Sequence, residues 1–285
     1  LLFMLGLPES PRWLAENISL DEARRVLQRV RKSEADINFE LDEIRVVVAE
    51  GGSGRKASWA MLAEPWLRPA VIAAYGVAAF TQLSGLETMI YYTPTVLSGA
   101  GFGKSAALLA SLSVAIVFVT MTAIGRHIVD RVGRRRLALT MLPGTVICLL
   151  AVGILFQMGM ATSPRGAWLL VVALLLYMVF DAGGIQVIGW LMGSEMFPLA
   201  IRGKASSVHA ATLWGTNLIV TSTALSMVSV LGTGGAMWVY AGLNFLCFVF
   251  VWHFVPETSG HSLEDIENHL RAGRFMELKM KRAAE

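Results

Sequence analysis

Charged residues are scarce in this chain, and cysteines are almost absent. Only 16% of the 285 residues are Asp, Glu, Lys or Arg, whereas 55% are hydrophobic and the mean hydropathy is +0.58. A soluble domain needs more charge to cover its surface, so the composition predicts a chain that lies in a lipid bilayer. The two cysteines, Cys148 and Cys247, stand in apolar stretches, which excludes a disulfide framework.

The sequence also lacks the residue patterns of common catalytic sites. It has no nucleophile–base pair and no metal-ligand spacing, and the run Gly52-Ser53-Gly54-Arg55-Lys56 lacks the spacing of a phosphate-binding loop. We therefore expect no enzyme activity, no cofactor and no ATP-driven transport. The net charge of +3 does not indicate a nucleic-acid partner, because the basic residues cluster between apolar runs.

Long apolar runs occupy most of the chain after residue 68. A helix needs about 20 residues to cross a hydrocarbon core, and four runs reach this length: 69–97, 105–125, 137–164 and 166–196. Residues 205–256 contain no Lys, Arg, Asp or Glu and are too many for one crossing, so this run must turn, at Gly232-Thr233-Gly234-Gly235. The sequence predicts an all-α membrane protein with six spans.

The positions of the basic residues test this number of spans. An even number places both flanks of the apolar region on the same side, and Lys and Arg are enriched in cytoplasmic loops. Of the 24 Lys and Arg residues, the expected outer loops hold only Lys104 and Arg165. The pattern predicts a multi-pass protein of the plasma (inner) membrane whose linker and C-terminus are cytoplasmic.

Four segments are expected along the chain. Residues 1–7 are a short apolar stretch that we interpret as the end of a preceding membrane helix. They are not interpreted as a signal peptide, because they have no basic start and no small-residue cleavage site. Residues 8–64 are expected to form a cytoplasmic helical linker, in which Ser19-Leu20-Asp21-Glu22 is similar to a capping box. Residues 65–256 hold the six spans, and residues 257–285 form a cytoplasmic tail.

The loop between the second and third spans is short and charged. Gly125 is followed by Asp130-Arg131-Val132-Gly133-Arg134-Arg135. Gly133 allows the backbone to reverse, while the Asp and Arg side chains can pair with neighbouring helix ends. A plain positive-inside anchor would explain the arginines but not Asp130 and Gly133. We interpret this loop as part of a gate.

Five short motifs occur in a fixed order along the chain. They are Pro-Glu-Ser-Pro-Arg-Trp-Leu at 8–14, Gln-Leu-Ser-Gly at 82–85 with Tyr-Tyr-Thr-Pro at 91–94, the charged loop at 130–135, Ser-Glu-Met-Phe-Pro at 194–198 with Arg202-Gly203-Lys204, and Pro-Glu-Thr at 256–258 with Gly260 and Leu-Glu-Asp-Ile at 263–266. Together they resemble the sugar porter family of the major facilitator superfamily. The resemblance covers essentially the whole chain.

This resemblance implies a twelve-helix fold of two six-helix halves that rock against each other around a substrate held near the midplane. The chain would supply the C-terminal half with the intracellular helical linker, and its partner would be the missing N-terminal six-helix half. The resemblance also implies a charge network that acts as a cytoplasmic gate, made of Glu9, Arg12, Asp130, Arg131, Arg134, Arg135, Glu195, Arg202 and Glu257.

Sugar recognition needs hydrogen-bonding groups for hydroxyls and flat apolar faces for ring C–H groups, in a concave site between helices. For an isolated polar residue in a span the alternative is a hydrogen bond between helices, and for a Trp it is packing or an interfacial position. The resemblance favours Gln82, Trp190 and Trp214 as contacts. The full set of candidates is Gln82, Glu87, Tyr91, Tyr92, Asp181, Trp190, Trp214 and Asn217.

Glu87 and Asp181 are the only carboxylates deep in the apolar spans. A charge there is costly, so each indicates a function. Glu87 is expected to be a substrate contact or a proton site, and the alternative is a salt bridge to a basic residue of the missing half. Asp181 precedes Ala182-Gly183-Gly184, and its alternative role is to cap a helix break.

The chain departs from the family pattern at several positions that contact hydroxyls. Thr81 precedes Gln82 where a pair of Gln residues is usual, Glu87 replaces an Asn, and Leu213 precedes Trp214 where an amide is common. The prolines usual before Trp190 are absent. These departures leave the substrate open.

The leading expectation is secondary active transport of a sugar or polyol by alternating access, in symport with protons. Two alternatives remain open. One is a proton-coupled transporter of another small metabolite such as an organic cation, for which Glu87 and Asp181 would be counter-charges. The other is a sensor that binds a sugar without carrying it.

Overall fold

The computed structural model describes residues 8–31, 33–49, 58–99 and 103–278. The expected end of a preceding membrane helix, residues 1–7, lies outside these ranges. The chain forms two compact units, Leu1–Ser58 and Trp59–Glu285. The second unit thus begins a few residues before the expected boundary at residue 65, and it includes the described part of the C-terminal tail.

Three short helices form the first unit: α1 (Pro11–Asn17), α2 (Leu20–Val30) and α3 (Glu34–Ala49). The hydroxyl of Ser19 accepts a hydrogen bond from the backbone N–H of Glu22 at 3.3 Å, so the predicted capping residue does begin α2. Helices this short are marginal alone, and burial of a shared apolar core holds them together. That core consists of Leu14, Ala23, Leu27, Ile37, Leu41 and Ile44.

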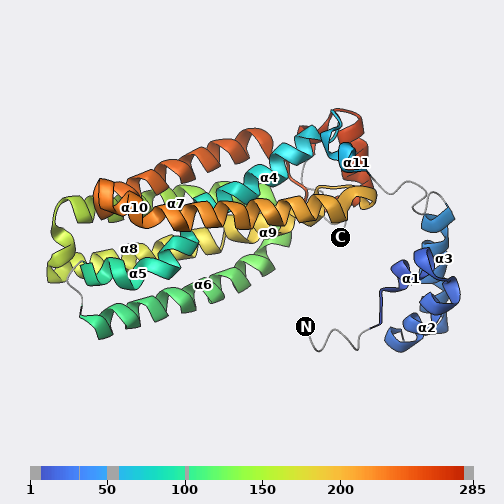
Figure 1. Ribbon diagram of the computed structural model, residues 1–285, viewed down its shortest axis with the longest axis horizontal. Helices are drawn as coiled ribbons and strands as arrows, with labels where there is room; N and C mark the ends of the chain where they lie inside the picture. Colours follow the sequence, from blue (N-terminus) through green and yellow to red (C-terminus); the bar gives the residue numbers. More distant parts are fainter. Residues whose placement is uncertain (1–7, 32, 50–57, 100–102, 279–285) are drawn as a thin grey trace. The chain divides into compact units, whose positions relative to one another are not determined.

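The second unit is a bundle of long apolar helices (Figure 1). A 3-10 turn, η2 (Trp59–Ala63), leads into it, and η3 (Met160–Thr162) connects two of the helices. The bundle helices are α4 (Arg68–Leu83), α5 (Leu86–Gly99), α6 (Lys104–Val132), α7 (Arg134–Gln157), α8 (Pro164–Ala182), α9 (Ile185–Glu195) and α10 (Leu199–Phe254). The short helix α11 (Leu263–Arg271) and the turn η4 (Phe275–Glu277) follow.

Five apolar segments in the described residues are long enough to cross a membrane, and the last of them holds two crossings. α10 has 56 residues, which at about 1.5 Å each would extend about 84 Å, whereas a hydrocarbon core is about 30 Å thick. The backbone at Gly232 is not helical, with φ 70° and ψ 167°, and Figure 1 shows α10 doubling back. The predicted turn and the six predicted spans are thus confirmed for the part of the chain that is described.

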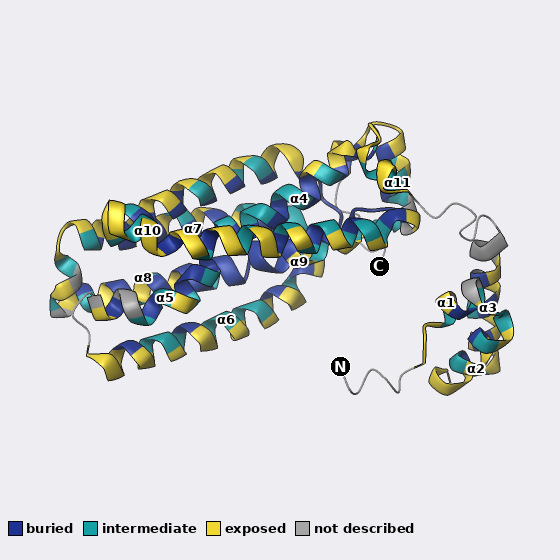
Figure 2. Ribbon diagram, viewed as in Figure 1, coloured by how far each residue is buried: buried dark blue, intermediate teal, exposed yellow. Residues whose placement is uncertain are grey.

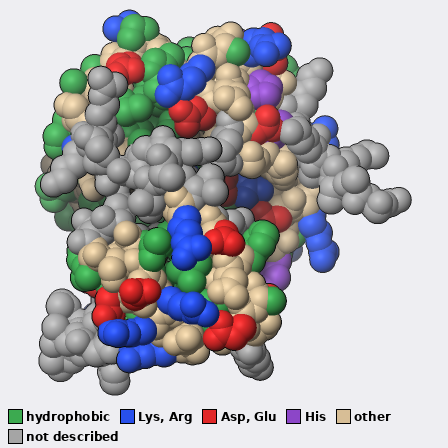
Figure 3. Space-filling model, turned by 90° about the vertical axis from the view of Figure 1, so that its right-hand side faces the viewer, with side chains coloured by type: hydrophobic (Ala, Val, Ile, Leu, Met, Phe, Trp, Pro, Cys, Tyr) green, Lys and Arg blue, Asp and Glu red, His purple; other side chains and the backbone are tan. Residues whose placement is uncertain are grey.

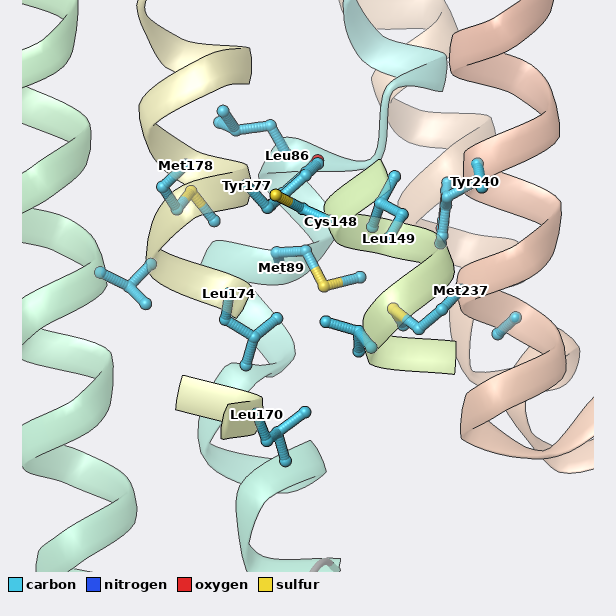
Figure 4. Packing of buried hydrophobic residues seen from close by; sticks show 14 of the residues in the cluster. Leu86, Met89, Cys148, Leu149, Leu170, Leu174, Tyr177, Met178, Met237 and Tyr240 are labelled. Carbon is cyan, nitrogen blue, oxygen red and sulfur yellow. The ribbon is translucent and has the colours of Figure 1, made fainter. Parts of the chain in front are cut away.

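The core of the bundle lies between α5, α7, α8 and the second half of α10. Figure 4 shows side chains from these helices that meet there, among them Leu86, Met89, Leu149, Leu174, Tyr177, Met237 and Tyr240. α6 contributes little to this core, and much of its surface is exposed (Figure 2). Its exposed side chains include Leu108, Leu109, Leu112, Ile116 and Val119. Such an apolar surface faces lipid or another protein surface, not water.

Candidate substrate site and charged helix ends

Two of the spans are broken near their middle. α4 and α5 form one span and are separated by Ser84 and Gly85, and Gly85 has a φ of 88°, which residues with a Cβ atom rarely adopt. α8 and α9 form another span and are separated by Gly183 and Gly184. Each break leaves backbone carbonyl groups without a partner in their own helix. Polar side chains inside the bundle are therefore needed to donate hydrogen bonds to these carbonyl groups.

Side chains from three other helices hold the break between α4 and α5. The carbonyl oxygen of Ser84 accepts hydrogen bonds from the hydroxyl of Tyr177 in α8 and from Nδ2 of Asn244 in α10, both at 3.0 Å. The carbonyl oxygen of Thr81 accepts one from Nε2 of Gln186 in α9 at 3.3 Å. An unpartnered carbonyl in a hydrocarbon interior costs several kcal/mol. These bonds therefore stabilise the bent span.

Gln82 and Asn217 come from different helices and form a hydrogen-bonded pair. Nδ2 of Asn217 in α10 donates to Oε1 of Gln82 in α4 at 2.9 Å. Gln82 is 3% exposed, and Asn217 is half-buried. The bond leaves Nε2 of Gln82 as a donor and Oδ1 of Asn217 as an acceptor, and among the described residues neither has another partner. A donor beside an acceptor is suited to bind a hydroxyl group.

Trp190 and Trp214 form an aromatic pair on the same part of the bundle. The ring of Trp190 in α9 meets that of Trp214 in α10 edge to face, with centroids 6.1 Å apart. The two residues are 50% and 60% exposed, so both rings offer open surface. Trp214 precedes Asn217 by three residues, which places both on one face of α10. The aromatic pair and the amide pair thus belong to one surface.

α5 carries the other candidates of the first span. Glu87 is half-buried in the first turn of α5, and Tyr91, which is 54% exposed, interacts with it one helical turn later. Tyr92 has different surroundings: it lines a cavity of about 290 Å³ together with Thr88 and Tyr240. α5 thus presents Glu87 and Tyr91 in one direction and Tyr92 in another.

Asp181 is placed differently from the other candidates. None of its surface is exposed, and its Oδ2 lies 3.2 Å from the hydroxyl oxygen of Ser84. It therefore stands between the two helix breaks and is fully enclosed by the bundle. In this conformation it offers no atom to a substrate.

Charged side chains meet at one end of the bundle, where α6, α9 and α7 end or begin. Nε and Nη2 of Arg134 in α7 bind the two carboxylate oxygens of Glu195 in α9 at 3.0 and 2.8 Å. Nη2 also lies 2.8 Å from Oδ1 of Asp130, in the last turn of α6. The Arg134 side chain is only 12% exposed. This forked pairing ties three helix ends together.

Glu257 closes the N-terminus of α7. Its Oε1 accepts a hydrogen bond from the backbone N–H of Arg134 at 2.8 Å, and its Oε2 accepts one from that of Arg136 at 3.4 Å. The first N–H groups of a helix lack intrahelical partners and carry a partial positive charge, so a carboxylate there stabilises the helix. Gly133, just before α7, has a φ of 94°, as the predicted reversal of the backbone requires.

Three further gate candidates of the second unit, all arginines, differ in what they contact. Nη2 of Arg135 donates to the carbonyl oxygen of Trp252 at 2.6 Å, and its guanidinium lies 5.8 Å from the centre of that ring. Nε and Nη2 of Arg202 both lie 3.4 Å from the carbonyl oxygen of Phe197. Arg131 is exposed. Arg135 and Arg202 thus contact backbone groups at the same end of the bundle.

The remaining gate candidates, Glu9 and Arg12, belong to the first unit. Glu9 is exposed just before α1, and Arg12 lies in the first turn of that helix. Figure 3 shows acidic and basic side chains interspersed on one face of the molecule. Among the gate candidates of the second unit, ion pairs and helix-end hydrogen bonds join Asp130, Arg134, Glu195 and Glu257, while Arg135 and Arg202 contact backbone carbonyl groups.

The sequence analysis did not identify the side chains that hold the break at Ser84. Tyr177, Gln186 and Asn244 were missed, although each is a polar residue within an apolar run. An isolated polar residue in a span is consistent with many partners. The sequence did not show to which backbone carbonyl groups these side chains would donate hydrogen bonds.

Broken membrane helices around a polar and aromatic surface, with charged residues at one set of helix ends, define the architecture of a secondary transporter half. Comparison with known proteins identifies the family. The chain matches the model of the family described as Sugar (and other) transporter over residues 1–270, and it belongs to this family.

Relatives of known name are transporters, not enzymes. The major myo-inositol transporter IolT of Bacillus subtilis (strain 168) is 34% identical over 269 residues, which cover 94% of this chain and 56% of that protein. A D-xylose transporter of Levilactobacillus brevis is 37% identical over 282 residues, which cover 95% of this chain and 59% of that protein.

Solved structures of the xylose transporter XylE share the fold. The proton:xylose symporter XylE bound to 6-bromo-6-deoxy-D-glucose aligns with a TM-score of 0.73 at 26% identity, covering 94% of this chain and 55% of that one. The inward open conformation of XylE from E. coli aligns with a TM-score of 0.68 at 26% identity, covering 94% and 52%. The chain spans little more than half the length of these proteins, and its second unit has the fold of one half of a major facilitator transporter.

Proposed function

We propose that this chain provides one half of a secondary active transporter that carries a sugar or polyol by alternating access, in symport with protons. The observation that carries this proposal is the surface formed by the Gln82–Asn217 pair and the Trp190–Trp214 pair beside two broken spans. It joins hydrogen-bonding groups to flat apolar faces, as recognition of a polyhydroxylated ring requires.

Each part of the surface has a distinct task in this proposal. The free donor of Gln82 and the free acceptor of Asn217 bind neighbouring hydroxyls, while the Trp rings cover the C–H faces of the ring. Glu87, with Tyr91 one turn away, contacts a further hydroxyl at the rim. Tyr92 contributes from the separate cavity that it lines with Thr88 and Tyr240.

Alternating access needs a second six-helix half, which closes over the surface from the other side. In this proposal the contacts of Arg134 with Asp130 and Glu195 form a latch on the cytoplasmic side. The side is assigned from the cluster of Arg131, Arg134, Arg135 and Arg136 at those helix ends, because basic residues are enriched in cytoplasmic loops. The linker and the tail then lie in the cytoplasm. The latch closes when the site faces outward and breaks when it faces inward.

Uptake in cells that make the full-length protein tests the proposal. Radiolabelled inositol, xylose and glucose are supplied with and without a protonophore. We expect accumulation of at least one of them, and its loss when the proton gradient collapses. Failure to take up any sugar or polyol would contradict the proposal, and accumulation that resists the protonophore would contradict proton symport.

A second candidate is transport of an organic cation, which the half-buried carboxylate of Glu87 favours. The two candidates differ in which compounds compete for the site. Excess unlabelled sugar should abolish uptake of the labelled sugar, whereas quaternary ammonium compounds should leave it unchanged. The reverse pattern would favour the cation.

A further inference from the structure

Ser84 and Asp181 connect the two helix breaks of the bundle. Ser84 separates α4 from α5, and Asp181 lies at the end of α8, just before the break that leads into α9. The hydroxyl oxygen of Ser84 lies 3.2 Å from Oδ2 of Asp181, and both residues are buried, with 1% and 0% of their surface exposed. This contact joins the two breaks through a pair of side chains.

The hydroxyl group of Ser84 has a nearer acceptor than Asp181. The same hydroxyl lies 2.8 Å from the carbonyl oxygen of Thr81, a shorter contact than that to the carboxyl group. A hydroxyl carries one hydrogen and can accept with its lone pairs. If Ser84 donates to Thr81, its contact with Asp181 is a hydrogen bond only when the carboxyl group carries a proton and donates it.

The other carboxyl oxygen supports the same assignment. Oδ1 of Asp181 is buried without a hydrogen-bond partner among the described residues. An ionised carboxylate needs several donors or a cation to offset its burial, whereas a neutral carboxyl group needs far less. One unpartnered oxygen is therefore tolerable for the protonated form and costly for the ionised form.

No positive charge compensates Asp181 within the described residues, where the ion pairs lie elsewhere. The titratable groups that face this region come from four elements. Tyr177 lies one turn earlier on α8, Cys247 and Tyr240 come from α10, Cys148 from α7, and Glu87 from α5. These groups are phenols, thiols and a carboxyl group. None of them can neutralise a buried carboxylate.

We propose that Asp181 is a proton-binding site that links the two helix breaks, holding its proton while the Ser84 contact is closed and releasing it when the breaks separate. Separation of α8–α9 from α4–α5 admits water, which solvates the ionised carboxylate. The proposal rests on the proposed transport function. In it, Asp181 is the acid whose protonation controls the contact between the two broken spans that carry the substrate surface.

Infrared difference spectroscopy of the purified full-length protein tests the protonation directly, without any substrate. We expect a band from a protonated carboxyl group at neutral pH that disappears in Asp181→Asn and shifts in Ser84→Ala, because the hydrogen-bond acceptor has been removed. Glu87→Gln is the matched control and should leave this band in place. If Asp181→Asn fails to fold, the shift in Ser84→Ala decides the question. A wild-type protein without this band at neutral pH would overturn the proposal.

A transport measurement separates this proposal from the wider function. Asp181→Asn imitates the protonated form permanently, so we expect it to exchange labelled for unlabelled sugar across vesicles at near the wild-type rate. Under a proton gradient, by contrast, the variant should bring the labelled sugar only to equal concentrations inside and outside the vesicles. Accumulation that remains at the wild-type level would overturn the role of Asp181. Absence of sugar exchange in the wild-type protein would contradict the proposed function, while the infrared band would still report on Asp181.

Discussion

Arg134 grips both carboxylate oxygens of Glu195, through Nε at 3.0 Å and Nη2 at 2.8 Å, and so joins the start of α7 to the end of α9. A planar guanidinium matches a carboxylate in this way, whereas the ammonium of lysine is a single point of charge. The choice of arginine at this position is therefore a matter of geometry as well as charge.

Replacement of this arginine by lysine should weaken the end of the bundle. Arg134→Lys keeps the charge but loses one of the two charge-assisted hydrogen bonds to Glu195, each worth about 1.5–3 kcal/mol. We expect a lower Tm in detergent, followed by the fluorescence of a thiol-reactive dye on the buried cysteines. Arg131→Lys is the control because Arg131 is exposed. Equal Tm values for the two variants would show that the forked contact contributes nothing.

The carboxylate of Glu257 should stabilise α7 through its charge. It accepts hydrogen bonds from the backbone N–H groups of Arg134 and Arg136 at the helix N-terminus. Glu257→Gln keeps the size of the side chain but removes the charge, which is worth about 0.3–1 kcal/mol near a helix end and up to about 2 kcal/mol when partly buried. A loss of this size should appear in thermal unfolding. The exposed Glu277, changed to Gln, should show no loss.

The spans were predictable because they depend on composition along a single helix. Runs of about 20 apolar residues and the turn at Gly232 follow from chain length and bilayer thickness alone. The contact of Asp181 with Ser84 was not predictable, because it depends on where two breaks meet across helices that are far apart in sequence.

The pairing of charged residues at the end of the bundle was likewise only partly predictable from the sequence. The motif around Asp130 and Arg134 showed that charges gather there, and Gly133 marked the reversal. It did not show that Glu257 would cap α7, because that contact joins residues separated by more than a hundred positions. A sequence pattern shows which charged residues gather at a site. Which of them pair with each other depends on how the helices pack.

Loss of Asn244 should destabilise the bent span. Its Nδ2 donates to the carbonyl oxygens of Ser84 and Tyr240 at 3.0 and 2.9 Å, and the residue is fully buried. Asn244→Leu fills the space but leaves the Ser84 carbonyl with one partner fewer, at a cost of about 1–3 kcal/mol. The midpoint of thermal unfolding should fall accordingly. Asn268→Leu, at an exposed position of α11, serves as the control, and a similar fall there would point to general damage.

The aromatic pair should report sugar binding directly. Trp190 and Trp214 are in edge contact and exposed, so a ring that stacks on them changes their environment. We expect a transported sugar to change the intrinsic fluorescence of the full-length protein. Trp190→Phe and Trp214→Phe should each reduce that change, whereas Trp168→Phe, at a position of α8 that is 74% exposed, should not. An unchanged response in both site variants would remove these rings from the substrate surface.

Gln82 and Asn217 should act as one unit in substrate binding, because each orients the other through the bond at 2.9 Å. Removal of either side chain loses its own contact with the sugar and frees its partner to rotate. We expect Gln82→Ala and Asn217→Ala each to raise the KM for uptake about tenfold, equivalent to about 1.4 kcal/mol. The double variant should be little worse than either alone, because contacting residues are not additive. Ser222→Ala is the matched control on α10, since within the described part of the chain its hydroxyl contacts carbonyl groups of its own helix alone. Fully additive effects of the two substitutions would mean that the amide pair does not bind the substrate as a unit.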